Sequence, residues 1–130
     1  MQVCIPPDYQ FTDYFRRDST DPYFPDAALN IFAAGYDGQQ VGGFRTLPLE
    51  HETLAAGLWV DPEHRRQGVG SQLMRNAIRR YGTTDIRLKV NPFGDKPMLL
   101  HRLVRFYAGF GFLVDTSYRS APVVMVRRRQ

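Results

Sequence analysis

Two adjacent arginines and two closely spaced glycines stand where a loop meets the start of an amphipathic helix, at residues 65–70 (RRQGVG). The first N–H groups of a helix have no partner within the helix, and the helix dipole adds partial positive charge there. Anions bind at such positions, glycine lets a phosphate approach the backbone, and arginine attracts it. The segment therefore predicts a pyrophosphate site.

Two common phosphate-binding motifs do not fit this segment. A Walker loop requires Gly-Lys-Ser/Thr, and the dinucleotide fingerprint requires three glycines in Gly-x-Gly-x-x-Gly. Residues 68–73 (GVGSQL) supply neither pattern. A glycine-containing turn with solvated arginines stays open as long as the segment is considered alone.

The elements before this segment are predicted to be strands. Residues 29–36 and 41–46 predict a hairpin, because Asp37-Gly38 suits the positive φ angles of a tight turn. Residues 53–60 predict a third strand, which Asp61-Pro62 ends. Its period of two places four apolar residues on one face. They are Leu54, Ala56, Leu58 and Val60.

Two helices and more strands follow. Apolar positions at helical spacing run from Val69 to Tyr81 and stop at Gly82, and residues 85–90 alternate as a strand does. Such a strand, helix, strand unit implies a parallel pair with a right-handed crossover. A second helix is predicted from near Pro97 to the glycines at 109 and 111, with an apolar face. That face comprises Leu99, Leu100, Leu103, Phe106, Tyr107 and Phe110.

The two ends of the chain complete the predicted fold. Residues 112–115 and 123–126 predict an antiparallel pair, residues 127–129 a solvated arginine tail, and residues 9–17 a short helix. The fold class is thus α/β with a mixed sheet. The 130 residues predict one domain spanning 1–130, in which residues 1–28 form a separate N-terminal segment.

Composition narrows the class of protein. No stretch approaches the apolar length that crosses a bilayer, and residues 1–7 lack the pattern of a secretory signal, so we expect a cytoplasmic protein. Cys4 is the single cysteine, which excludes an internal disulfide and a cysteine-based metal site. A net charge of +4 fits a nucleic acid, an acidic protein or a polyanionic small molecule.

A second motif, FYAGFGF at residues 106–112, supports the first. Residues 59–70 (WVDPEHRRQGVG) resemble motif A of the GNAT superfamily of N-acetyltransferases, and residues 103–112 resemble its motif B. The resemblance runs from about residue 29 to the C-terminus, with both motifs in the family's order. It implies a mixed, mostly antiparallel sheet, with a central parallel pair splayed around the cofactor and flanking helices.

The resemblance also implies acetyl-CoA as the cosubstrate, with no metal. Its pyrophosphate would lie on residues 65–71 and its pantetheine along the backbone of residues 58–60, where an N–H can stabilise the oxyanion. The cofactor-binding residues implied are Leu58, Trp59, Val60, Arg65, Arg66, Gln67, Gly68, Val69, Gly70 and Ser71.

Acid and base are predicted for direct attack of an amine on the thioester. An amine with a pKa of about 10.4 must lose a proton before it attacks. Tyr107 stands where the family has its general acid, with a core tyrosine as the alternative. The family's usual base position falls on Leu54, so Glu52 is the candidate base, with His51, Glu50 or relayed water as alternatives.

Other residues bear on metal and acceptor. His64 and His101 are expected in solvent-exposed positions, without a pattern of metal ligands. Where the family often has Asn, the chain has Leu100, and residues 91–95 form an inserted loop. Residues 1–28 are too few for the family's usual strand and two helices, which predicts a short, open acceptor groove on a shortened substrate side.

Three functions follow in order of preference. The first is acetyl transfer to a primary amine of a protein, a peptide or a small molecule, and the second is a weakly catalytic CoA-binding interaction module. A nucleic-acid-binding protein is third, resting on charge alone. A homodimer through the C-terminal strand is left open, and no membrane partner is expected.

Overall fold

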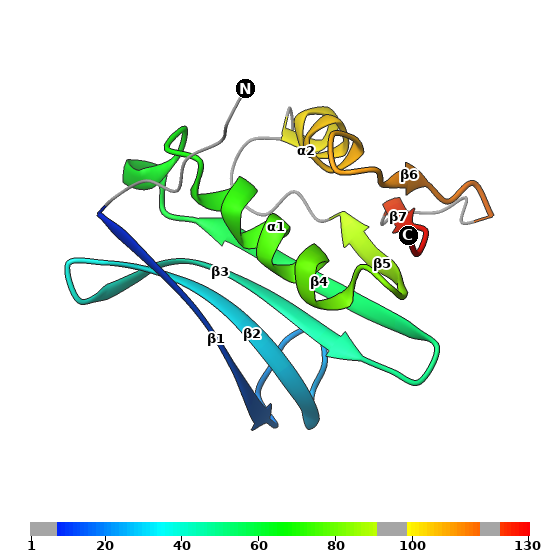
Figure 1. The fold of residues 1–130 in the computed structure, drawn as a ribbon, viewed down its shortest axis with the longest axis horizontal. Helices are drawn as coiled ribbons and strands as arrows, with labels where there is room; N and C mark the ends of the chain where they lie inside the picture. Colours follow the sequence, from blue (N-terminus) through cyan, green and yellow to red (C-terminus); the bar gives the residue numbers. More distant parts are fainter. Residues whose placement is uncertain (1–7, 91–98, 118–122) are drawn as a thin grey trace.

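The computed structural model describes residues 8–90, 99–117 and 123–130. Within them a seven-stranded sheet has the order β1-β2-β3-β4-β5-β7-β6, and every neighbouring pair is antiparallel except β4 and β5 (Figure 1). The strands are β1 (Tyr9–Asp18), β2 (Ala27–Tyr36), β3 (Gln39–Pro48), β4 (Glu52–Val60), β5 (Asp85–Val90), β6 (Leu113–Val114) and β7 (Val123–Arg127). The helices are the 3-10 turn η1 (Pro62–His64), α1 (Val69–Tyr81) and α2 (Leu99–Ala108). The predicted fold class is confirmed.

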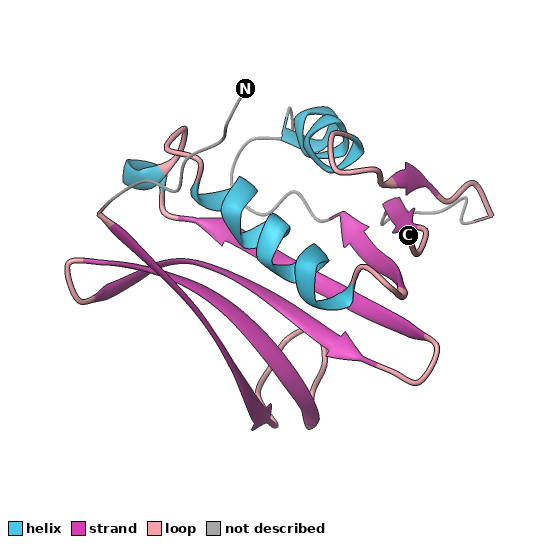
Figure 2. Cartoon of the chain, viewed as in Figure 1, coloured by secondary structure: helices cyan, strands magenta, loops and turns pink. Residues whose placement is uncertain are grey.

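Helix α1 lies across one face of the sheet, over β2, β3 and β4, and α2 lies beside β5 and β6 (Figure 2). The amphipathic spacing of α1 buries Val69, Leu73, Met74 and Ala77 against the sheet. Phe44 of β3 and the inward residues of β5 complete this core. The core therefore fixes α1, and with it the start of α1, relative to the end of β4.

The hairpin of β2 and β3 turns as predicted. Asp37 and Gly38 both have positive φ, at 52° and 79°. These angles match the right-handed twist of the two strands, and glycine adopts them without steric cost.

Strand β4 departs from the predicted pattern at Gly57. Gly43 pairs with Trp59 whereas Arg45 pairs with Ala56, so β4 carries one extra residue between the two pairs. Gly57 takes a φ of 71° in this bulge. The prediction of one shared face was wrong, because a bulge shifts the alternation by one residue. Ala56 lies on the face away from α1, together with Leu54, whereas Leu58 and Val60 pack against the core on the α1 side.

The N-terminal segment is a strand, so the helix predicted over residues 9–17 was wrong. Strand β1 pairs with β2 along its whole length, from Tyr9 opposite Tyr36 to Asp18 opposite Ala27. Its aromatic residues favour a pleated surface, and Tyr9 and Phe11 pack against the core. Residues 19–26 connect β1 to β2 and contain no helix.

The C-terminal part of the fold follows the prediction except in two details. Arg127 is half-buried in β7 and donates from Nε to the carbonyl of Phe110, 2.9 Å away, so residues 127–129 are not wholly a solvated tail. Strand β7 lies between β5 and β6, so it is not the edge predicted for dimerisation. The helix start predicted near Pro97 and the loop at residues 91–95 lie outside the described residues.

Strands β4 and β5 pair over only four positions, from Glu52 opposite Asp85 to Ala55 opposite Leu88. Both strands continue beyond these pairs, to Val60 and Val90, without pairing to each other. The sheet therefore opens between them toward their carboxyl ends. Ligands of open α/β sheets bind outside such strand ends.

Candidate functional site

A pocket of about 500 Å³ lies at the carboxyl end of β4. The end of β4, the loop after it, the first turn of α1 and one side of α2 form its walls. The lining residues are Leu58, Trp59, Val60, His64, Arg65, Arg66, Gly68, Val69, Gly70, Ser71, Arg102, Leu103 and Phe106.

The loop between β4 and α1 presents backbone N–H groups at this pocket. The first helical hydrogen bond runs from the N–H of Gln72 to the carbonyl of Gly68, so the N–H groups of Val69, Gly70 and Ser71 have no acceptor in the helix. Gly68 precedes α1 with a φ of 82°, and the first turn carries no acidic residue. This is the arrangement that binds an anion.

Arginines from two elements surround the same space. Arg65 donates from Nε to the carbonyl of Val60 at 3.0 Å, which fastens the loop to the end of β4. Arg66 has a φ of 64°, which is unusual for a residue with a Cβ. Arg102 reaches the pocket from α2. The pocket is therefore cationic on both of its walls.

Gly70 sets the width of the pocket. A Cβ at this position would lie 3.6 Å from Val60 Cγ2 and 3.8 Å from Phe106 Cζ. Glycine thus keeps the space between β4 and α2 open at the start of α1.

His64 is tied to the N-terminal strand. Its Nδ1 lies 2.8 Å from the hydroxyl of Tyr9, and its ring centroid lies 4.9 Å from that of Tyr36. His64 is half-buried and lines the pocket, so the expectation of a solvent-exposed loop residue was wrong. The aromatic contacts fix the loop between β4 and α1 (residues 61–68, the pocket loop) against the β1–β2 hairpin. His101, by contrast, is exposed on α2, as expected.

The structure brings the predicted cofactor residues together. All ten except Gln67 line the pocket. Gln67 is exposed on the loop between Arg66 and Gly68. The clustering is a direct result of chain order, because these residues occupy a single strand end, loop and helix start.

Tyr107 lies in the core. It is buried among the rings of Phe106 and Phe112, whose centroids lie 5.4 and 5.9 Å from its own. Its neighbour Phe106 lines the pocket, whereas Tyr107 does not. Burial raises the pKa of the Tyr107 phenol well above its ordinary value, and the nearby Tyr23 adds to this. The phenol therefore holds its proton firmly. Its role as an acid stays a prediction.

Glu52 lies at the beginning of β4, whereas the pocket lies at its end. The five residue steps from Glu52 to Gly57 span roughly 17 Å of strand. A carboxylate oxygen of Glu52 lies 3.6 Å from Nε of Arg87. Glu50 and His51 are exposed in the turn before β4. None of the three lines the pocket, and the assignment of the base stays a prediction.

Sequence reasoning missed the α2 wall of the pocket. Leu103 and Phe106 were recognised as part of an apolar face, and their spacing of three residues places them on one side of the helix. Nothing in the sequence marks that side as part of the pocket, which the structure shows that it lines. Arg102 stands beside that face and carried no motif signal. No group of three His, Cys, Asp or Glu side chains that could hold a metal ion occurs in the described part of the chain.

A protein-family comparison identifies the fold's family. The model described as "Acetyltransferase (GNAT) domain" matches residues 27–114. The chain belongs to the GNAT acetyltransferase family. The match covers both motifs, the pocket and most of the sheet, and it confirms the predicted resemblance. No curated protein matches this GNAT chain.

Solved structures share the GNAT fold with this chain. A GNAT acetyltransferase of Elizabethkingia anophelis, crystallised with acetyl-CoA, is 13% identical with a TM-score of 0.64, and 94% of this chain covers 99% of that one. The ribosomal-protein-S18-alanine N-acetyltransferase of Escherichia coli is 16% identical with a TM-score of 0.65, and the match covers 92% of each chain.

A third structure is longer than this GNAT chain. The PaiA N-acetyltransferase of Thermoplasma acidophilum, in complex with coenzyme A, is 19% identical with a TM-score of 0.61. The match covers 75% of this chain but only 59% of the Thermoplasma protein. At these identities the likeness concerns the fold. None of the described helices is long and apolar enough to cross a membrane.

Proposed function

We propose that this GNAT protein transfers an acetyl group from acetyl-CoA to a primary amine. The single observation that carries the proposal is the cationic pocket at the point where β4 and β5 separate, lined by the first turn of α1. The neighbours crystallised with coenzyme A and acetyl-CoA have the same fold, which supports a similar ligand here. We take residues 1–130 to form one domain of a cytoplasmic protein, with the N-terminal segment on its substrate side.

The proposed cofactor site uses backbone and arginine groups. The N–H groups of the first turn of α1 and the guanidinium groups of Arg65 and Arg66 hold the pyrophosphate. Arg102 contributes charge from the opposite wall. The backbone of residues 58–60 holds the pantetheine, and an N–H there stabilises the oxyanion on the thioester carbonyl.

In the proposed reaction the neutral amine nitrogen forms a bond to the acyl carbon. The C–S bond then breaks, one amine proton is lost, and the CoA sulfur gains a proton. Tyr107 is the proposed donor of that second proton, and Glu52 or relayed water is the proposed acceptor of the first. Because the pKa of Tyr107 is raised, its phenol first donates a hydrogen bond to the departing sulfur. It passes the proton to the sulfur as the C–S bond breaks and regains a proton from solvent.

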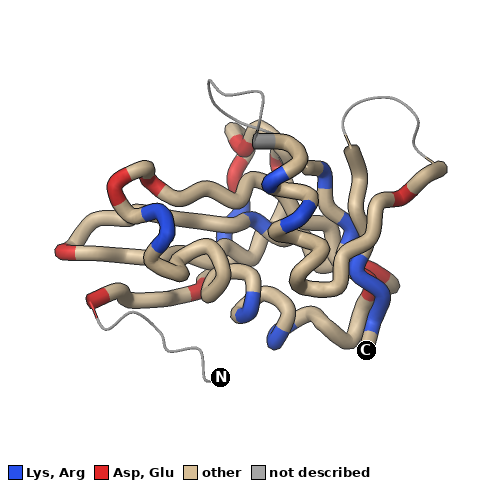
Figure 3. The backbone as a smooth tube through the Cα atoms, turned by 90° about the horizontal axis from the view of Figure 1, so that it is seen from above, with Lys and Arg blue, Asp and Glu red and all other residues tan. Residues whose placement is uncertain are grey.

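One observation favours a second function. Neither Tyr107 nor Glu52 lines the pocket. This fits a CoA-binding module that has little catalytic activity and functions by binding a partner. A nucleic-acid-binding function gains no support, since the basic segments in Figure 3 are spread over several elements and interspersed with acidic ones.

Two measurements test these proposals in sequence. Calorimetry with acetyl-CoA should give micromolar or tighter binding, and absence of binding would reject both CoA-dependent functions. Thiol release with a panel of amines and peptides then separates the enzyme from the interaction module.

A variant tests the role of Tyr107. In the enzyme, Tyr107→Phe should lower kcat about tenfold or more and leave acetyl-CoA affinity unchanged. The matched control is Tyr81→Phe, at a tyrosine that bonds Asn30 away from the pocket.

A further inference from the structure

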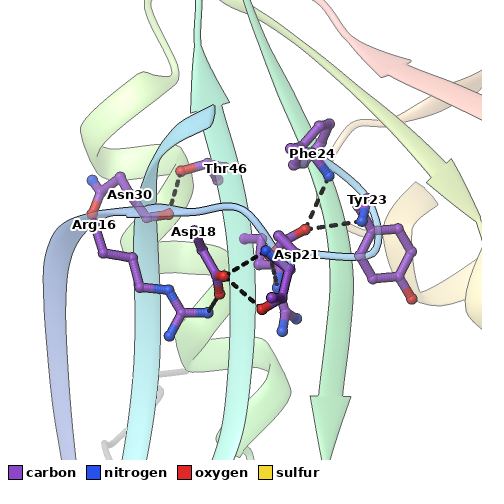
Figure 4. Close-up of polar contacts among 9 residues, drawn as sticks. Arg16, Asp18, Asp21, Tyr23, Phe24, Asn30 and Thr46 are labelled. Carbon is purple, nitrogen blue, oxygen red and sulfur yellow. Dashed lines mark hydrogen bonds and ion pairs between the residues drawn. The ribbon is translucent and has the colours of Figure 1, made fainter. Parts of the chain in front are cut away.

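The face of the sheet away from α1 carries a second cluster of side chains, around Gly57 of β4. Residues 19–26 cross this face after leaving β1, as Figure 4 shows with the loop in front of the strands and α1 behind them. The loop brings Asp21 and Tyr23 over the sheet, where they meet Arg45 of β3. Arg45 lies 24 residues beyond Asp21 in the sequence.

Asp21 fixes the position of Arg45. Its Oδ1 accepts the N–H groups of Tyr23 and Phe24 at 2.9 and 3.0 Å, and its Oδ2 accepts Nε of Arg45 at 2.5 Å. Burial alone would raise the pKa of the Asp21 carboxyl, but these N–H groups and the Arg45 guanidinium outweigh burial and hold it below its usual range. A charged carboxylate with no exposed side-chain surface therefore anchors the guanidinium.

The guanidinium lies against the bulge of β4. A Cβ on Gly57 would be 3.0 Å from Arg45 Nη1 and 3.0 Å from Tyr23 Cε2. Both groups thus approach the backbone of β4 because residue 57 has no side chain. The pairing of β4 with β5 ends at Ala55, two residues earlier. Arg45 consequently stands beside the mouth of the opening between these strands.

Arg45 has donors to spare at this position. Its Nε–H is used by Asp21, whereas neither Nη has a hydrogen-bond partner among the residues that the structure describes. The side chain keeps 23% of its surface exposed. A guanidinium that is held through Nε and whose Nη groups can still donate is able to bind a carboxylate.

An aromatic surface adjoins the guanidinium. Trp59 lies over Gly43, where a Cβ would be only 2.8 Å from its Nε1, and the indole side chain remains 37% exposed. Positions 43 and 45 of β3 point to the same face and are about 7 Å apart. An apolar part of a bound molecule can pack on Trp59 while an anionic group meets Arg45.

We propose that Arg45, positioned by Asp21, binds a carboxylate of the acceptor, so that the acceptor is an amine that also carries a carboxylate, such as a free amino acid. This inference rests on the proposed function, because it assigns the acceptor side of the same reaction centre. The carboxylate remains on Arg45 while the amine nitrogen faces the opening between β4 and β5.

The test compares acids with their amides on the purified full chain. Acetyl-CoA affinity is measured first and judges the proposed function by itself. Thiol release is then followed with the twenty L-amino acids and with the α-amide of each. The acids should have kcat/KM values at least tenfold above those of the amides. The amide is the less basic amine, so amine ionisation cannot produce that preference. Equal rates, or turnover of carboxylate-free amines alone, would overturn the inference and leave acetyl-CoA binding intact.

A variant locates the preference at Arg45. Arg45→Gln should raise KM for the acids at least tenfold, remove the preference over amides and leave acetyl-CoA affinity within twofold. The matched control is Arg16→Gln, at a cation of β1 that pairs with Asp18. If Arg45→Gln does not fold, the acid-to-amide ratio of the unchanged protein decides. If no amine is turned over, the same pairs are titrated into the CoA-saturated protein, where a missing preference for acids rejects the inference.

Discussion

The two faces of the sheet near the end of β4 are assembled in different ways. On the α1 side, the pocket loop and helix start come from one continuous run, residues 58–71, and expose mainly backbone N–H groups and arginines. On the other side, Asp21, Tyr23 and Arg45 come from a loop and a distant strand and act through side chains. The first arrangement presents backbone groups that a side-chain substitution leaves in place. The second depends on three particular side chains, so a substitution there can alter it and leave the pocket intact.

The first prediction concerns only the pocket on the α1 side of the sheet. Gly70→Asp places a carboxylate and its bulk between Val60 and Phe106, so acetyl-CoA affinity should fall at least about a hundredfold, or about 2.7 kcal/mol. An acidic residue in the first helical turn is compatible with α1, so folding should persist. Calorimetry measures the loss. Thr83→Asp, which adds the same charge at an exposed position beyond the other end of α1, should change affinity little. Similar losses in both variants would mean that net charge, and not the pocket, determines binding.

The second prediction concerns the Asp21–Arg45 ion pair on the opposite face of the sheet. Asp21→Asn leaves Arg45 without its charged partner and should lower the free energy of unfolding by about 2 kcal/mol at neutral pH, or about 8 °C in Tm. The pKa of Asp21 is lowered in the folded protein, so its contribution is present above the unfolded pKa of about 3.9 and is lost as pH falls through the folded value. Urea unfolding between pH 5 and pH 2 should therefore be less pH-dependent in the variant. An unchanged pH dependence would contradict the assignment.

The third prediction separates backbone strain from crowding at the bulge. Gly57→Ala and Gly38→Ala both force a side chain onto a positive φ, at 71° and 79°, which costs about 1 kcal/mol. A Cβ at Gly57 also meets Tyr23 and Arg45, whereas one at Gly38 meets nothing within 4 Å. Urea unfolding should show a loss of about 1.5 kcal/mol or more for Gly57→Ala and a smaller loss for Gly38→Ala. Equal losses would show that the cluster yields without cost.

The smallest expected effect concerns the α2 wall. Arg102→Gln should weaken acetyl-CoA binding about fivefold, close to 1 kcal/mol, and the effect should shrink at high salt because the charge is exposed. Arg105→Gln, on the same helix but outside the pocket lining, is the control. If both arginines contribute equally, the attraction is long-range and α2 forms no specific contact.

The contrast between the faces also explains what the sequence could predict. Residues 65–70 and the Asp37-Gly38 turn carry their geometry locally, so the residue types and their spacing were enough to predict the pocket loop and the hairpin. The pairing of β4 with β5 followed from chain order. The Gly57 bulge could not be predicted, because a single glycine within a strand does not show where an extra residue interrupts the pairing with the neighbouring strand.

Long-range contacts account for the remaining errors. Strand β1 was mistaken for a helix because its stability comes from pairing with β2, which the local spacing of its aromatics does not contain. His64 was expected in solvent because Tyr9, 55 residues away in sequence, provides its hydrogen bond. The Asp21–Arg45 pair likewise has no sequence signature. Residues brought together from distant segments become visible only in the folded chain.

The early end of the β4–β5 ladder has a consequence for the stability of the protein. Beyond Ala55, the side of β4 that faces β5 has backbone N–H and C=O groups without a partner strand in the described residues. The sheet therefore has a gap between β4 and β5 beyond Ala55, and an extended ligand that contains amides can form hydrogen bonds to β4 there. Occupancy should then slow amide hydrogen exchange at residues 56–60 and raise the unfolding temperature in proportion to the logarithm of ligand concentration.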